Sequence, residues 1–129
     1  MENPNSSPRA RAAGAERPVA LLVDRDDDSR AMYAEFMKLQ AWTTEEAADG
    51  PEGLAKALSC RPSIVITETQ LPGISGYDLV TLLRRDVQTK AIPIVVVTAD
   101  AYDGAVSRAR NAGADQVLIK PCLDRKSVV

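Results

Sequence analysis

The sequence predicts an α/β fold, in which five parallel strands form a doubly wound sheet with helices on both faces. Two observations support this prediction. Short apolar runs alternate with segments of helical periodicity along most of the chain. Most of these runs are apolar throughout rather than at every second residue, which is typical of strands buried on both faces of a parallel sheet.

The strands are predicted from compact apolar runs, the first of which, "VALLV", is too short to form a helix of its own. The second run is the weakest, because Glu45 and Glu46 interrupt it. A loop must follow the third run, since "LPGISG" contains a proline and two glycines. The predicted strands are residues 19–23, 42–48, 63–67, 92–99 and 116–120.

Four helices are predicted between these strands, at residues 27–40, 51–58, 77–85 and 102–113. Asp27 or Asp28 is the natural N-cap of the first helix. Pro51 is expected at the first position of the second helix, where its missing N–H has no cost. Gly113 is expected to end the fourth helix in a left-handed conformation.

The composition is that of one globular domain, because 129 residues with 45% apolar and 26% charged side chains suffice for a single core. The first 17 residues, rich in Pro, Ser, Asn and Arg, show no apolar periodicity and predict a disordered tail. A basic arm or targeting peptide is the alternative reading of this tail, opposed by Glu2 and Glu16. We therefore expect a tail at residues 1–17 and a domain at residues 18–129.

Several classes of function are disfavoured by the same composition. The net charge of −2 gives no general attraction to nucleic acid or anionic membrane, and no apolar run approaches the ~20 residues of a membrane span. Cys60 and Cys122 form no disulfide framework or metal motif. Without histidine, a zinc site or histidine-based triad is excluded. A reduced, cytoplasmic setting is expected.

Four polar side chains stand where predicted strands end: Asp24, Glu68, Thr98 and Lys120. In parallel sheets of this type, ligands and chemistry are found at the carboxyl ends of the strands. Each residue alone is adequately explained as a solvated strand end. Two carboxylates, a hydroxyl and an amine at one edge of one sheet instead predict a functional site.

The chain also resembles a known family, the receiver domains of two-component response regulators. The resemblance runs from Val19 to about Pro121 and is carried by "LLVD" before an acidic run, "LPGISG", "VVVTA" and "AGADQVLIKP". It implies a flavodoxin-like (β/α)5 fold. It also implies a signalling function in a phosphorelay, without enzymatic activity of its own.

In that family, an aspartate ending the third strand accepts a phosphoryl group from a kinase phosphohistidine, and acids after the first strand help to hold Mg²⁺. The resemblance places Thr98 and Lys120 as phosphoryl contacts, and Asp24, Glu68 and the backbone of Gln70 as metal positions. Such chemistry needs a hard cation and fixed donors to neutralise developing phosphoryl charge. The Lys120–Pro121 bond, often cis in the family, would orient the lysine.

Three positions depart from the family pattern. Glu68 stands four residues before the loop proline, Pro72, where the phosphoacceptor aspartate is usual. Arg25 replaces the second acid of the pair after the first strand. Val117 stands where the family usually has an aromatic switch residue, which puts the usual conformational readout in doubt.

These departures change the charge of the expected site. The usual three carboxylates and one lysine sum to −2, whereas Asp24, Glu68, Arg25 and Lys120 sum to zero. Because each contact between charges in a partly buried site contributes roughly 4 kcal/mol, Mg²⁺ is expected to bind weakly, if at all. Glutamate is also longer than aspartate by about 1.5 Å, and a misplacement of ~1 Å can cost a hundredfold in rate.

The sequence therefore predicts an atypical receiver that works without phosphorylation. Glu68 paired with Lys120 would mimic the active state, with Arg25 supplying the charge of the metal. Alternatively, the site has decayed and Arg25 points to solvent. A working phosphoacceptor that recruits Asp26 through a shifted register is a further reading. A small flavodoxin-like enzyme or nucleotide binder is opposed by the absence of a Gly-rich phosphate loop.

After Pro121 only "CLDRKSVV" remains, which predicts a short or missing last helix, or a chain cut from a longer protein. The expected partners are proteins, namely a sensor kinase or an output domain. Apolar area exposed beside the fourth predicted helix and fifth predicted strand, at residues 102–120, favours a homodimer. No contact with nucleic acid or membrane is expected.

Overall fold

The computed structural model describes residues 17–100 and 103–120. Within these ranges five strands form one parallel sheet in the order β2-β1-β3-β4-β5. The strands are β1 (Val19–Val23), β2 (Thr43–Ala47), β3 (Ile64–Glu68), β4 (Ile94–Thr98) and β5 (Gln116–Ile119). The helices are α2 (Asp27–Leu39), α3 (Gly50–Cys60), α4 (Gly76–Arg85) and α5 (Asp103–Ala112). The predicted doubly wound α/β fold is confirmed.

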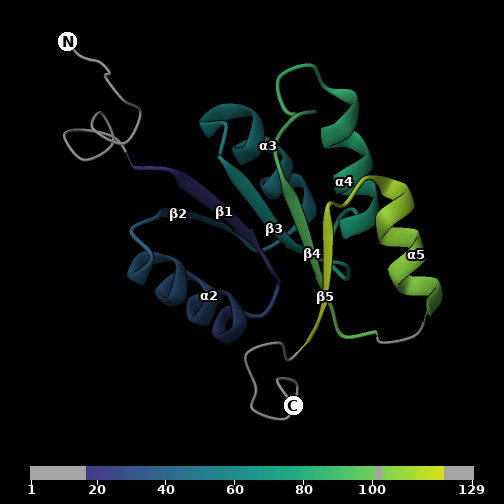
Figure 1. The fold of residues 1–129 in the computed structure, drawn as a ribbon, viewed down its shortest axis with the longest axis horizontal. Helices are drawn as coiled ribbons and strands as arrows, with labels where there is room; N and C mark the ends of the chain where they lie inside the picture. Colours follow the sequence, from purple (N-terminus) through teal and green to yellow (C-terminus); the bar gives the residue numbers. More distant parts are fainter. Residues whose placement is uncertain (1–16, 101–102, 121–129) are drawn as a thin grey trace.

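Helices cover both faces of the sheet: α2 packs on one face, and α3, α4 and α5 lie on the other (Figure 1). Alternate residues of β1 divide between the two layers. Leu21 and Val23 pack with Leu79 and Leu83 of α4, whereas Leu22 packs with Met37 of α2. β1 thus contributes to two cores, which explains why its sequence is apolar throughout.

The strand order determines where a site can form. β1 is flanked by β2 and β3, so the chain reverses its direction of winding between β1 and β3. Such switch points leave a crevice outside the carboxyl ends of the strands. The residues that end or follow β1, β3, β4 and β5 therefore lie at one edge of the sheet, as predicted from the sequence.

The start of α2 differs from the prediction by one residue. Asp26, not Asp27 or Asp28, is the N-cap, and its carboxylate accepts hydrogen bonds from the backbone N and Oγ of Ser29 at 2.9 and 2.6 Å. Asp27 and Asp28 then occupy the first turn, where their charges favour the helix dipole. Capping thus engages the carboxylate of Asp26 with Ser29.

Two glycines and a proline occupy special positions near the other helix ends. Gly113 has φ +123° after α5, in agreement with the predicted left-handed conformation. Asp49 caps α3, so Pro51 is the second residue of that helix rather than the first. Gly76 begins α4 against the end of β3, where a β-carbon would collide with the carbonyl oxygen of Glu68. A glycine is therefore required for this close approach.

The apolar residues of α2 are only partly used for packing. Met37 is buried, but Phe36 and Leu39 are 49% and 75% exposed, and Leu118 of β5 is also exposed. No helix in the described part of the chain is long and apolar enough to span a bilayer. The predictions for the first 16 residues, for Pro121 and for a last helix lie outside the described residues.

Candidate functional site

The four polar residues predicted to meet at the strand ends are all found at this edge. Glu68 and Thr98 are the last residues of β3 and β4, and Asp24 and Lys120 directly follow β1 and β5. Asp24, Glu68 and Thr98 are buried. Burial of two carboxylates is unfavourable unless they are paired, so their partners determine what the site can do.

Lys120 is the partner of both carboxylates. Its Nζ atom lies 2.8 Å from Oδ2 of Asp24 and forms a second ion pair with Oε1 of Glu68. Burial by itself lowers the pKa of Lys120, but the hydrogen bonds and charges of Asp24 and Glu68 outweigh it and raise the pKa above its ordinary value. The ammonium group therefore remains charged at neutral pH.

Further donors hold Asp24 in place. Its Oδ1 accepts a hydrogen bond from the backbone N–H of Asp26 at 2.8 Å, and its carbonyl oxygen accepts one from Nη1 of Arg30 at 2.6 Å. Arg30 also pairs with Glu46 at 2.9 Å and Asp27 at 2.6 Å. Arg30 was not predicted as a site residue from the sequence, although it lies one turn into a helix that starts beside Asp24.

Thr98 contacts a different neighbour. Its Oγ1 lies 3.1 Å from Oγ1 of Thr69 and accepts a hydrogen bond from the backbone N–H of Asp100 at 3.0 Å. Both threonine side chains are buried. Thr98 thus forms a hydroxyl pair beside the ion-paired carboxylates. Thr69 was missed in the sequence because a threonine after a strand carries no specific signal.

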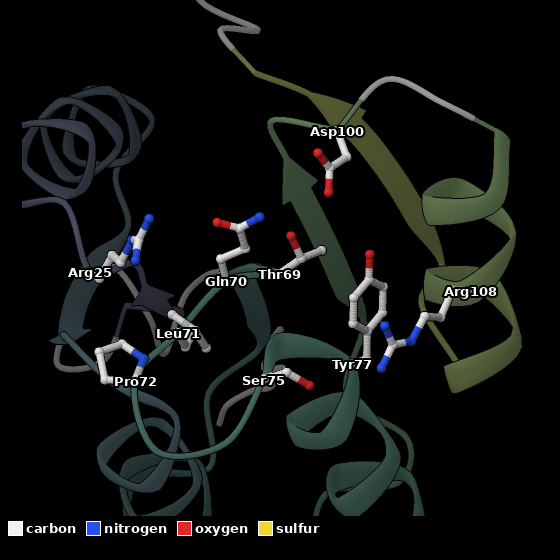
Figure 2. Close-up of a pocket in the computed structure, with 9 residues that line it drawn as sticks. All are labelled: Arg25, Thr69, Gln70, Leu71, Pro72, Ser75, Tyr77, Asp100 and Arg108. Atoms are coloured by element: carbon white, nitrogen blue, oxygen red, sulfur yellow. The ribbon is translucent and has the colours of Figure 1, made fainter.

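Arg25 does not lie between the two carboxylates. Its side chain is exposed and forms no hydrogen bond or ion pair with the described residues, and it lines a neighbouring cavity with Gln70 (Figure 2). The expectation that Arg25 supplies the charge of the metal is therefore wrong, and Lys120 is the cation that the two carboxylates contact. Arg25 lies in the loop that leads to α2, whereas Lys120 directly follows β5, whose end lies at the site.

The comparison with protein families agrees with this architecture. A family model described as the response regulator receiver domain matches residues 20–128. The chain belongs to the response regulator receiver family. It is accordingly a receiver domain of the kind found in two-component response regulators.

This receiver is similar to several known proteins. It is 30% identical over 113 residues to a gliding motility regulatory protein of Myxococcus xanthus, covering 88% of this chain and 14% of that protein. It is 32% identical to the transcriptional regulatory protein AfsQ1 of Streptomyces coelicolor, covering 84% of this chain and 47% of AfsQ1. The receiver thus spans less than half the length of these two relatives.

The solved structures confirm the fold of the receiver. The chemotaxis response regulator CheY4 of Vibrio cholerae superposes with a TM-score of 0.77 at 30% identity, covering 81% of this chain and 88% of that one. The sheet order of this receiver is the flavodoxin-like order.

The residues present do not fit the divalent metal ion that the receiver family implies. Of the expected ligands, Asp24 and Glu68 are both paired with Lys120, and Gln70 lines the neighbouring cavity. Asp26, the acid of the shifted-register alternative, caps α2. Among the described residues no group of three or more acidic, cysteine or histidine side chains could hold a metal ion. A divalent cation would have to compete with the ammonium group for both carboxylates.

Val117, at the position of the family's aromatic switch, is half-buried and packs against the core on the side of α3 and α4. Valine has no ring that could exchange between an inward and an outward position. Its role in this receiver stays a prediction.

Proposed function

We propose that this receiver transmits signals through protein–protein contacts without accepting a phosphoryl group. The observation that carries the proposal is the double ion pair of Lys120 with Asp24 and Glu68. The buried carboxylates already have a cationic partner that is part of the chain. Without Arg25, the charges of Asp24, Glu68 and Lys120 sum to −1, against −2 for the usual three carboxylates and one lysine, so the site attracts a divalent cation less strongly than a usual receiver site.

The identity of the acceptor residue supports the same proposal. Glu68 is 6% exposed, and its carboxylate is held by Lys120. A nucleophile in this position would have to leave the ammonium group and accept a phosphoryl group without a second acid beside Asp24, because Arg25 stands there. Electrostatic stabilisation of the transferring group would be missing.

Within this proposal we favour a constitutive mimic of the active state over a decayed scaffold. In the receiver family the lysine contacts the phosphoryl oxygens, and here Glu68 provides a negatively charged oxygen at that contact. Replacing Glu68 by Gln should then change the backbone amide NMR shifts of β5 and α5. Shift changes limited to the immediate neighbours of residue 68 would indicate a scaffold instead.

The proposal extends to the binding partner and the cellular location of the protein. We expect a sensor kinase or an output domain as the partner, a cytoplasmic location, and no enzymatic activity. The expected homodimer surface is formed by α5 and β5, and the exposed Leu118 of β5 adds an apolar side chain on the opposite sheet face, beside Phe36 and Met37 of α2. Sedimentation of the wild-type protein and of Leu118→Ser would test this surface.

The central experiment is incubation with a small phosphodonor and Mg²⁺, followed by intact mass measurement. We expect no phosphoryl adduct on the wild-type protein. An adduct that disappears in Glu68→Gln would contradict the proposal and identify Glu68 as a working acceptor. An adduct that disappears only in Asp26→Asn would support the shifted-acid alternative, which the capping role of Asp26 disfavours.

A further inference from the structure

A second site is indicated beside the strand-end crevice, in a cavity of about 540 Å³. Its walls come from the loops after β1, β3 and β4 and from α4 and α5. Neither Asp24, Glu68, Thr98 nor Lys120 lines it. Its volume falls within the range of small-molecule pockets, roughly 300–1,000 Å³.

Two arginines line this cavity without a carboxylate partner among the described residues. Arg25 makes no side-chain hydrogen bond there, and the guanidinium of Arg108 lies 4.0 Å from the centroid of the Tyr77 ring. A guanidinium over a ring face can still donate its N–H groups to other acceptors, and those of Arg108 make no hydrogen bond with the described residues. Guanidinium groups with free N–H edges suit the oxygens of phosphate or carboxylate groups.

The arrangement of the lining residues restricts the ligand further. Figure 2 shows Arg25 and Arg108 on opposite sides of the cavity, with Gln70 and Thr69 between them. Asp100 is the one acidic residue in the lining, so the charged side chains sum to +1. A ligand with negative groups at two ends fits this distribution. Arg108 already covers one face of the Tyr77 ring, so a nucleobase could not stack on that face.

We propose that this cavity binds a small dianion of the pyrophosphate type, with one oxyanion on Arg25 and the other on Arg108. The amide of Gln70 and the hydroxyl of Ser75 lie in the lining and supply neutral hydrogen bonds. Thr69 lines the cavity and contacts Thr98, so an occupied cavity has a direct path to the strand-end site. The proposal concerns non-covalent binding and holds whether or not Glu68 accepts a phosphoryl group.

The test is titration of the full chain with inorganic pyrophosphate by calorimetry and amide NMR. We expect saturable binding, with shifts centred on Gln70, Ser75 and Tyr77. Arg25→Gln and Arg108→Gln should each weaken binding about tenfold or more, because each removes a charge-assisted contact. Asp100→Asn should tighten binding, because it removes a repelling charge.

Arg110→Gln is the matched control, since Arg110 is an exposed arginine of α5 that does not line the cavity. The affinity of the Arg110→Gln variant for pyrophosphate should equal that of the wild type. Absence of saturable binding, or an equal loss in Arg110→Gln, would overturn the proposal. Equal affinity for orthophosphate and pyrophosphate would also overturn it, because only one arginine would then be in use.

Discussion

The Nζ atom of Lys120 lies 2.8 Å from Oδ2 of Asp24, although 96 positions separate the two residues along the chain. Lys120 follows the edge strand β5, and Asp24 follows β1, with β3 and β4 between them. Glu68 of β3 joins the same ammonium group. One lysine thus connects the carboxyl ends of three strands and offsets one of the two negative charges that meet there.

Replacing Lys120 by Met should lower the free energy of unfolding by about 3 kcal/mol, because two buried carboxylates lose their partner. Urea unfolding followed by circular dichroism measures the change. Adding Glu68→Gln to this variant should recover part of the loss, which a double-mutant cycle quantifies. A loss below about 1 kcal/mol would mean that water screens the pairs.

Stability should fall at high pH. The folded-state pKa of Lys120 is raised above its ordinary value of 10.5, so its pairing stabilises the fold fully below that value. The stabilisation is then lost as the pH rises through the folded pKa. We expect the urea midpoint of the wild type to drop more steeply above pH 10.5 than that of Lys120→Met. Parallel curves for the two proteins would exclude Lys120 as the cause.

Restoring the family's acids should restore metal binding. In the double variant Arg25→Asp and Glu68→Asp, the site regains a carboxylate and loses a competing charge. We expect Mg²⁺ affinity, measured by calorimetry, to rise at least about tenfold over wild type, since each charge contact contributes several kcal/mol. Arg25→Gln alone is the control and should gain much less. Equal Mg²⁺ affinities in the wild type, the double variant and Arg25→Gln would show that the charge of the site does not limit metal binding.

Arg84 should be a main determinant of stability away from the site. Its guanidinium donates to the carbonyl oxygens of Gly113 and Ile92 at 2.9 and 2.7 Å and pairs with Asp115 at 2.8 Å. Arg84→Met should lower the free energy of unfolding by about 2 kcal/mol or more, because buried carbonyl groups lose a charged donor. Its neighbour Arg85 is exposed, with no side-chain bond to the described residues, and Arg85→Met should change stability by less than about 0.5 kcal/mol.

Most of the fold could be predicted from the sequence because its signals are local. The apolar runs predicted the strands. Gly113 predicted the end of α5, and "LPGISG" predicted the loop between β3 and α4. The N-cap of α2 was predicted at Asp27 or Asp28, because three consecutive acids all satisfy the same local preference. Only the bonds from Ser29 distinguish Asp26 among them.

The sequence by itself determined which residue types stand at the strand ends, because those positions follow from the alternation of strands and helices. It also determined that Glu68 and Arg25 replace the acids expected of a receiver. The tertiary structure decided which charges meet: Lys120 reaches both carboxylates, Arg25 lines a separate cavity with Arg108, and Thr98 pairs with Thr69. Such pairings depend on side-chain directions at the ends of non-adjacent strands, which no local pattern encodes.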